Sequence, residues 1–197
     1  CIPAVISGRL PSASITRRAA GAADDDRPGA YICGLGNWGT TNHLMTSQSY
    51  AAFRVANIRN VVTDLGTDAV QAIEAEKFAA LGGSMDVMLI DAAAVKNIAP
   101  LMQEDPTLLD TCKAWQTGEV YLEMAYNAYY TNYEIALANT WFAAKCVYPD
   151  LFTDVDMTAK TNEITKAFLG QELAEQIFAC PSSFGGYQQI DTASFFR

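Results

Sequence analysis

Hydrophobic positions along this chain follow two periods in turn, and the alternation predicts strands separated by helices. Continuous apolar runs, which are typical of buried strands, occupy residues 30–34, 86–90 and 120–124, with shorter candidates at 60–63 and 69–73. Apolar residues at helical spacing predict helices at residues 50–58, 74–81, 92–103, 106–115, 131–148, 154–169 and 171–178. Strands that alternate with helices predict an α/β fold in three layers: a Rossmann-like lobe whose mostly parallel sheet is flanked by helices.

The first 28 residues differ from the rest of the chain. They contain three prolines and, near their end, three consecutive aspartates, Asp24–Asp26. We therefore expect residues 1–28 to form a poorly specified arm or a helix remnant, and residues 29–197 to form the lobe. Within the lobe, the helices at 131–148 and 154–169 are expected to pack together as a hairpin.

Composition restricts the partners of the chain. Half of its 197 residues are hydrophobic, enough for a real core, and its formal net charge is −9. An acidic surface repels nucleic acid phosphates and anionic lipid headgroups, so we exclude both as main partners. No apolar run approaches the ~20 residues that span a bilayer.

The five cysteines are widely spaced and include no CxxC pair, and the chain is too large to need a disulfide framework. Cys33 lies in an apolar strand and Cys146 on an apolar helix face, so both are predicted to be small buried hydrophobes. Cys112 and Cys180 could pair, and the sequence leaves that question open.

Residues 125–134 hold four tyrosines and two asparagines where an apolar strand runs into a helix. Ligands of open parallel α/β sheets sit at such junctions. Tyr and Asn offer flat apolar faces with polar tips, which suits a bulky, partly polar molecule. Reactive groups are scarce, so the segment is interpreted as a ligand-binding segment rather than a catalytic site. The alternative is that the tyrosines belong to the core and that Thr131 or Asn132 only caps the helix.

Gly34, Gly36 and Gly39 match the GxGxxG pattern directly after a strand, and Asp64 follows 25 residues later. This is the spacing of a dinucleotide-binding loop. The final glycine should open a helix that faces pyrophosphate, yet Thr40 to His43 show no apolar helical period, and Trp38 would crowd the turn. A loop that faces a ligand is the favoured interpretation.

His43 is the only histidine, and a Ser or Cys nucleophile would have to rely on it as the base. Asp91 could orient it, but the chain has no nucleophile elbow such as GxSxG. No His, Cys or carboxylate cluster has metal-ligand spacing, and the single carboxylates near strand ends show no pairing. The sequence therefore predicts no catalytic residues and no metal site, and a protein that is not an enzyme.

Several segments in succession resemble one protein family. They are Tyr31–Gly39, Tyr50–Ile58 leading to Asn60–Val62, Ala72–Leu81 before Asp86–Asp91, Trp115–Gly118 before Val120, Tyr129–Glu134 before Ala136–Ala138, Tyr148–Phe152 and Phe184–Tyr187. Together they resemble the C-terminal half of the substrate-binding proteins of ABC importers for iron chelates, a class that also takes haem and vitamin B12. The resemblance covers roughly Asp24 to Ile190.

The resemblance implies half of a two-lobed periplasmic binding protein. Such proteins hold their ligand between two α/β lobes joined by a long helix, so an N-terminal lobe is missing here and residues 1–28 would be the remnant of the interlobe helix. A glutamate on each lobe docks onto arginines of the membrane permease. Glu76 stands where the family's docking glutamate falls, and Glu74 stands where the family often has Ser.

The chain is therefore expected to capture an iron chelate, such as a ferric siderophore, and to deliver it to a permease. It would work in the periplasm or at the cell surface, as a lipoprotein anchored to the membrane in its full-length form, and without a cofactor of its own. The expected ligand contacts are Trp38, His43, Thr46 and Ser47 in the first loop and Tyr126, Tyr129, Tyr130 and Asn132 in the second.

Two other hypotheses stay open at this point. Direct metal ligation by His43 or a tyrosine is a variant of the binding hypothesis. A Rossmann-type NAD(P)-dependent oxidoreductase fragment using Gly34, Gly36, Gly39 and Asp64 is the alternative from a different class, and a purely structural α/β module is a third.

Overall fold

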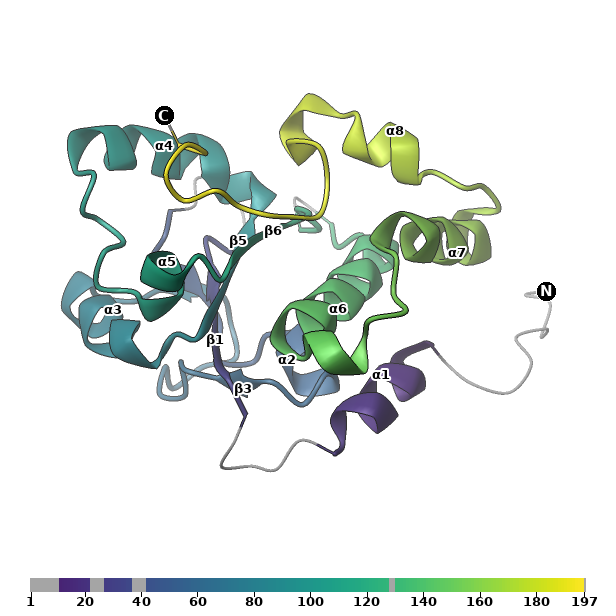
Figure 1. Ribbon diagram of the computed structural model, residues 1–197, viewed down its shortest axis with the longest axis horizontal. Coiled ribbons are helices and arrows are strands. Elements are labelled where there is room, and N and C mark those ends of the chain that lie inside the picture. The colour runs from purple at the N-terminus through teal and green to yellow at the C-terminus, as the bar shows by residue number, and fades with distance from the viewer. Residues whose placement is uncertain (1–10, 22–26, 37–41, 128–129, 197) are drawn as a thin grey trace.

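The computed structural model of the protein describes residues 11–21, 27–36, 42–127 and 130–196. Its main feature is one sheet with helices on both faces, and Figure 1 shows α1, α2, α6 and α7 on one side and α3, α4 and α5 on the other. The strands β2 (Met45–Thr46) and β4 (Gln71–Ala72) form a second, two-stranded sheet. The predicted three-layer α/β fold is confirmed.

The main sheet has five strands in the order β3-β1-β5-β6-β7. Their bounds are Arg59–Asn60 for β3, Gly29–Cys33 for β1, Val87–Asp91 for β5, Val120–Glu123 for β6 and Gln188–Gln189 for β7. The first four strands are parallel, and β7 runs antiparallel along β6. The sheet is therefore mostly parallel, as the alternation of strands and helices predicted.

Side chains of the central strands alternate between two cores, because successive residues of a strand point to opposite faces. In β1, Ala30 and Ile32 join one core, whereas Tyr31 and Cys33 join the other. The first core is completed by α1 (Pro11–Ala19), α2 (Ala51–Val55), α6 (Tyr133–Val147) and α7 (Met157–Leu169). The second is completed by α3 (Ala75–Leu81), α4 (Val95–Glu104) and α5 (Lys113–Thr117). Burial on both faces explains why these strands are apolar throughout.

The helices α6 and α7 pack against each other, which confirms the predicted hairpin. Asp156 caps α7 by accepting a hydrogen bond from the Ala159 N–H at 2.8 Å, and Gly170 ends it in the left-handed conformation with φ of 77°. The helix α8 (Ala174–Phe178) follows after a short turn. Among the residues that the structure describes, short 3₁₀ segments occur at Gly82–Ser84, Ala92–Ala94, Pro149–Leu151 and Pro181–Ser183.

The helix α1 falls in the segment expected to be an arm. Its Ile15 and Ala19 are fully buried in the first core, and Arg18 pairs with Asp154 beyond the end of α6 at 2.6 Å. The segment therefore contributes to the core. The division into residues 1–28 and 29–197 stays a prediction.

One sequence-based assignment was wrong, and one short strand was not predicted. The helix predicted at residues 106–115 is instead a series of turns followed by the short α5, because the Asp105 carboxylate accepts hydrogen bonds from the Thr107 N–H and hydroxyl and bends the chain. Residues 180–196 are mostly turns and irregular segments, but they supply the short strand β7, which the sequence did not predict. Its two glutamines carry no apolar signal, and the strand forms only because the edge of β6 offers unpaired backbone groups.

The cysteines follow the predictions in part. Cys33 and Cys146 are buried, as expected. Cys112 and Cys180 do not pair, because Cys112 is buried in the second core whereas Cys180 is exposed beyond α8. Both are free thiols.

Candidate functional site

The carboxyl ends of β1, β5 and β6 lie at one edge of the sheet, and the strand order reverses between β1 and β5. After β1 the chain continues to β3 on one side, and after β5 it continues to β6 on the other. Such a reversal opens a crevice beyond the strand ends, where ligands of open α/β sheets bind. Two segments border this edge. They are the first loop, residues 34–49, of which the structure describes 34–36 and 42–49, and the second loop, residues 124–132, of which it describes 124–127 and 130–132.

Asp91, the last residue of β5, ties the first loop to the sheet. Its Oδ2 accepts a hydrogen bond from the Gly36 N–H at 3.1 Å, and its Oδ1 accepts one from the Ala93 N–H at 2.8 Å. The carboxyl group is fully buried, and burial raises its pKa to about 6 although both backbone hydrogen bonds oppose the rise. Asp91 is therefore a positioning residue for the loop rather than a partner of His43.

This tie also decides against the dinucleotide-binding alternative. In that role the N–H groups of the glycine loop would face pyrophosphate, but the Gly36 N–H is taken by the Asp91 carboxylate. Residues 42–49 form turns and β2, and the next helix, α2, begins only at Ala51. Asp64 is exposed, four residues beyond the end of β3. Gly39 lies outside the described residues.

Asn127 joins the two loops. Its amide Nδ2 donates a hydrogen bond to the Gly36 carbonyl oxygen at 3.2 Å, and its Oδ1 accepts one from the Thr131 hydroxyl at 3.0 Å. The approach is close, since a Cβ atom on Gly36 would lie 3.2 Å from the Asn127 carbonyl oxygen. The segments that the sequence singled out after β1 and β6 therefore meet at the carboxyl edge.

A buried polar network lies under the second loop. Glu123, opposite Asp91 in the register of β5 and β6, accepts hydrogen bonds from the Tyr50 hydroxyl at 2.5 Å and from the Asn139 amide at 3.4 Å. Asn139 in turn donates to the Met124 carbonyl oxygen and accepts from the Tyr187 hydroxyl, both at 2.7 Å. Burial raises the pKa of Glu123 well above its usual range, the Tyr50 hydrogen bond opposes this, and the charge of Asp91 adds to it.

The tyrosines of the second loop divide into two groups. Tyr126 is half-buried, and its ring lies 6.3 Å from that of Tyr50, above the Glu123 network. Tyr130 and Tyr133 are 87% and 71% exposed. Large exposed aromatic rings are costly to leave in water, so these two mark the surface of the edge that is suited to contact another molecule.

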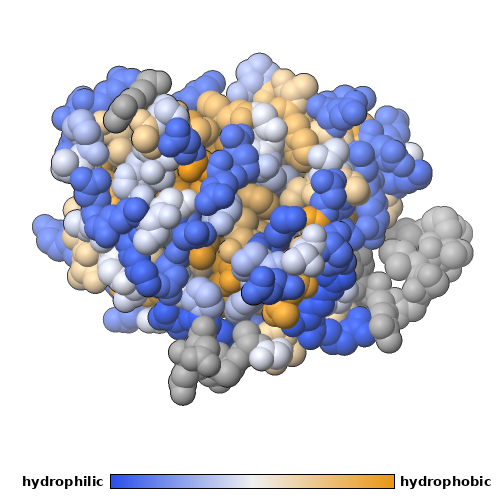
Figure 2. Space-filling view, in the orientation of Figure 1, coloured by the Kyte–Doolittle hydropathy of each residue, from blue (hydrophilic) through white to orange (hydrophobic). Residues whose placement is uncertain are grey.

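A hollow of about 440 Å³ lies beside the second loop. Glu134 and Ile135 at the start of α6 form one wall, and the segment from Leu169 to Ser183 forms the other. Figure 2 shows apolar surface among polar side chains near the top of the molecule, between α4 and α8. A hollow of this size with mixed lining can take part of a small organic ligand.

Of the residues expected in the first loop, three side chains are buried. His43 is 7% exposed and packs edge-on against Phe78 at 5.2 Å, and burial lowers its pKa. Thr46 is fully buried in β2, and the Ser47 hydroxyl accepts a hydrogen bond from the Ser49 N–H at 3.1 Å. A ligand contact of these three stays a prediction, and it requires the first loop to open. Trp38 lies outside the described residues.

The remaining predicted positions lie on the surface. Asn132 is exposed at the start of α6 and borders the hollow, and its side chain makes no capping hydrogen bond. Glu74 and Glu76 are exposed at the start of α3, where Glu74 likewise makes no side-chain cap. Tyr129 lies outside the described residues. The site assignments as a whole stay predictions.

Sequence analysis missed the groups that hold the loops in place: Glu123, Tyr50, Asn139 and Tyr187. A signal was present for Glu123, which is a single acid inside an otherwise apolar strand, and such a residue needs a buried partner. No local signal pointed to the wall of the hollow between Leu169 and Ser183.

Among the residues that the structure describes, no three His, Cys, Asp or Glu side chains form a group that could hold a metal ion. None of the described helices has both the length and the apolar character needed to cross a membrane.

No protein-family model and no curated protein matches the sequence of this chain. Several solved structures share its fold. The molybdate periplasmic binding protein MolA of Haemophilus influenzae is 17% identical, with a TM-score of 0.60 over 82% of this chain and 48% of that one. The TroA-like periplasmic binding protein FepB of Veillonella parvula is 16% identical, with a TM-score of 0.58 over 82% and 50%. CeuE of Helicobacter pylori is 14% identical, with a TM-score of 0.60 over 85% and 52%.

This chain therefore spans about half the length of the solved proteins that it resembles. MolA and FepB are described as binding proteins of the periplasm, and MolA serves an ABC transporter. At these identities the likeness establishes the fold alone, which this chain shares with about half of each of these proteins.

Proposed function

We propose that this chain is the C-terminal lobe of an ABC-importer substrate-binding protein, a non-enzymatic module that captures an iron chelate such as a ferric siderophore. One observation carries the proposal. The loops after β1 and β6 meet at the carboxyl edge, where the Asn127 amide lies 3.2 Å from the Gly36 carbonyl oxygen, and a hollow of about 440 Å³ adjoins the second loop. The fold shared with about half of each solved binding protein supports it.

The cargo in this proposal is a metal chelate. MolA was solved with molybdate and CeuE with Ni(II), so two structures of this fold hold metal-containing ligands. Iron is favoured by the succession of segments that resembles the iron-chelate class. In the proposal the organic chelator holds the metal, while the protein stacks against the chelator and donates hydrogen bonds to it.

The exposed tyrosines are central to the proposed contacts with the chelate. Tyr130 is 87% exposed at the edge, and with Tyr126, Tyr129 and Asn132 it would hold one face of the chelate. The first loop would contribute Trp38, with the buried His43, Thr46 and Ser47 available only after it opens. A missing N-terminal lobe would cover the opposite face, because a half-cleft cannot bury most of a ligand's surface.

Delivery of the cargo would use the exposed start of α3. Glu76 is the proposed docking residue for arginines of a permease, with Glu74 beside it, and arginine forks match carboxylates well. The protein would act outside the cytoplasmic membrane, anchored as a lipoprotein in its full-length form. MolA and FepB are periplasmic, which supports the compartment.

Native mass spectrometry with metal analysis tests the cargo. The full-length protein, purified from its own host under mild conditions, is expected to carry a co-purifying mass that contains iron. A bound NAD(P) mass would overturn the proposal. If the protein is empty, titration with a panel of ferric siderophores decides, and no affinity for any of them refutes the iron-chelate class.

Substitutions at Tyr130 test the proposed contacts between the second loop and the chelate. Tyr130→Ala combined with Tyr129→Ala should weaken chelate binding about tenfold, because the aromatic contacts with the chelator are lost. Tyr130→Ala alone should leave the melting temperature unchanged, because Tyr130 is exposed. Tyr130→Phe is the matched control and should retain the stacking part of the affinity. An unchanged affinity in the double variant would remove the second loop from the site.

Charge reversal tests docking. Glu76→Lys in the full-length protein should impair transport while leaving chelate affinity intact. Glu104→Lys, at the exposed end of α4, makes the same charge change elsewhere and is the control. Equal transport by both variants would reject the docking role of Glu76.

A further inference from the structure

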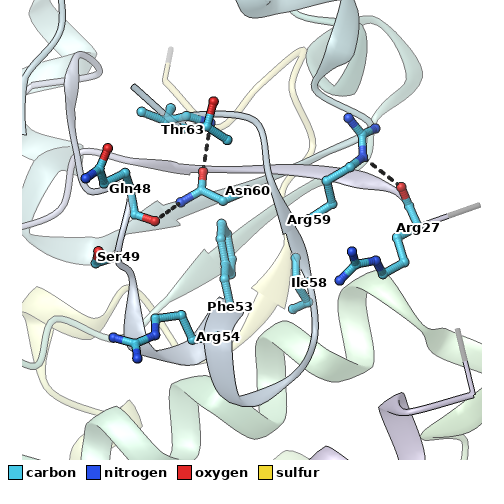
Figure 3. A pocket seen from close by; sticks show the side chains of 10 residues that line it. Arg27, Gln48, Ser49, Phe53, Arg54, Ile58, Arg59, Asn60 and Thr63 are labelled. Atoms are coloured by element: carbon cyan, nitrogen blue, oxygen red, sulfur yellow. Dashed lines mark hydrogen bonds between the residues drawn. The ribbon is translucent and has the colours of Figure 1, made fainter. Parts of the chain in front are cut away.

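A second pocket, of about 450 Å³, lies beside the edge strand β3. Its lining combines arginine side chains, polar groups and an apolar floor from α2 and the segment after it (Figure 3). Arg59 pairs in register with Gly29, the first residue of β1, whereas the first loop follows the last residue of β1 and the second loop follows β6. The pocket therefore lies on the β3 side of the sheet, and it meets the first loop only at Gln48 and Ser49.

The charge of this pocket is opposite to that of the chain. Arg27, Arg54 and Arg59 all line it, three of the five arginines that the structure describes, and none of its described lining residues is acidic. The whole chain carries 22 acidic residues against 13 basic ones. A hollow lined by one sign of charge focuses the local field, so anions concentrate there even on an acidic protein.

Two of the arginines are held by other parts of the fold. The Arg27 guanidinium donates a hydrogen bond to the Asn57 Oδ1 at 2.7 Å, and the Arg59 Nε donates one to the Arg27 carbonyl oxygen at 3.0 Å. Asp86 accepts a hydrogen bond from Arg59 at 3.4 Å, but it is shared with Lys113 at 2.7 Å. A ligand therefore does not have to order Arg27 and Arg59 from solvent, which lowers the entropic cost of binding.

The arginines lie on both sides of an apolar floor. Phe53 and Ile58 are 1% and 6% exposed, and Figure 3 shows Arg54 on one side of Phe53 with Arg27 and Arg59 on the other. Arg54 is exposed on the last turn of α2. A molecule resting on the floor would be flanked by guanidinium groups, which bind carboxylate and phosphate oxygens in a bidentate fashion.

We propose that this pocket binds a small, multiply charged oxyanion, a polycarboxylate or a phosphate ester, through Arg54 together with Arg27 and Arg59. Three guanidinium groups exceed what a monoanion needs, which favours more than one negative charge. The volume is in the range of small-molecule sites. The pocket touches the end of the first loop at Gln48 and Ser49, but it shares none of the residues proposed to contact a chelate.

Calorimetric titration of the full chain tests the proposal, with citrate and inorganic phosphate as probes at constant ionic strength in sodium chloride. Citrate is the probe for carboxylates and phosphate the probe for phosphate esters, so the two arms identify the group preferred. Arg54→Gln should weaken binding of the preferred probe about tenfold, because one hydrogen bond between charged groups is lost. Arg54→Lys keeps the positive charge but loses the bidentate guanidinium group, so its affinity for the preferred probe should lie between those of the wild type and Arg54→Gln.

Lys96→Gln is the matched control, since Lys96 is exposed on α4 and its loss changes the net charge equally. Amide shifts in NMR spectra should change around Ser49 and Asn60 on titration and stay constant on α4. Equal weakening by Arg54→Gln and Lys96→Gln would overturn the proposal, as would the absence of binding of both probes at millimolar concentration. These outcomes do not depend on whether a chelate binds elsewhere.

Discussion

Replacement of Glu123 is the sharpest test of how the second loop is supported. Its carboxyl group is fully buried under the loop, where Oε1 accepts from the Tyr50 hydroxyl at 2.5 Å and Oε2 has no hydrogen-bond partner. A buried ionised carboxylate with one orphaned oxygen is costly, whereas a protonated one is a neutral acceptor and donor. The structure therefore predicts that Glu123 is replaceable by Gln but not by Ala.

The expected magnitudes follow from the contacts. Glu123→Ala leaves the Tyr50 hydroxyl without its acceptor, while Asn139 keeps the Met124 carbonyl oxygen at 2.7 Å. One orphaned buried hydroxyl costs about 1–3 kcal/mol and the vacated space about 1–2 kcal/mol, a total loss of about 2–5 kcal/mol in the free energy of unfolding. Glu123→Gln keeps the volume and an acceptor oxygen, so its cost at neutral pH should be about 1 kcal/mol or less.

The pH dependence of stability has a definite sign. Burial raises the pKa of Glu123 in the folded protein, so the fold penalises the ionised form. The contribution of Glu123 to the free energy of unfolding is therefore most favourable below the pKa that this group has in the unfolded chain. It declines as the pH rises toward the raised pKa of the folded protein. The stability of Glu123→Gln relative to the wild type should therefore increase with pH across this range.

Urea unfolding followed by tryptophan fluorescence, at several pH values, gives the free energy of unfolding of the wild type, Glu123→Gln and Glu123→Ala. Equal destabilisation by Gln and Ala at pH 7 would refute the reasoning, because it would mean that an ionised carboxylate holds the network. A constant difference between Glu123→Gln and the wild type over the whole pH range would refute the predicted protonation.

Three further predictions concern the same edge. Gly34→Ala should lower the free energy of unfolding in urea by about 1–3 kcal/mol more than Gly66→Ala. Both glycines have positive φ, but only at Gly34 would an added Cβ lie 2.2 Å from another atom, the Ala94 Cβ. Equal losses of stability in the two variants would contradict the clash. Burial raises the pKa of Asp91 from 3.8 to about 6, so the fold penalises the ionised carboxylate. As the pH rises through these two pKa values, the wild type should lose about 3 kcal/mol of stability relative to Asp91→Asn. A stability difference between the two proteins that does not change with pH would contradict the raised pKa. Asn127→Ala should cost about 1 kcal/mol in unfolding free energy but speed amide hydrogen exchange of residues 34–36, and unchanged exchange would show that the bridge does not hold the first loop.

Much of the fold could be predicted from local pattern. The apolar runs identified β1, β5 and β6 within a residue at each end, because strands buried on both faces are apolar throughout. The helix predicted at residues 154–169 ends at Leu169 in the structure as well, because Gly170 supplies the left-handed residue that follows it. The strand β7 could not be found, since Gln188 and Gln189 owe their conformation to β6 and not to their own propensity.

Local pattern was less informative about the site. Residues 42–49 look like an exposed polar loop in the sequence, yet His43, Thr46 and Ser47 are buried. The cause is a set of distant contacts: β2 pairs with β4, Phe78 of α3 packs on His43, and Asn60 donates to the Ser47 carbonyl oxygen at 2.8 Å. Polarity alone does not predict exposure when partners from other elements satisfy the polar groups.

The order of apolar and polar residues thus specified an α/β chain with a mostly parallel sheet, and it marked the loops after β1 and β6 as the place to look for a ligand. Burial follows the period of each element, so a single segment carries that information. The hydrogen bonds that build the edge join residues far apart in the chain: Gly36 with Asp91, 55 residues on, Tyr50 with Glu123, 73 residues on, and Gly36 with Asn127, 91 residues on. Such pairs depend on the order of strands in the sheet, which no local pattern encodes, and so they emerged only when the chain was folded.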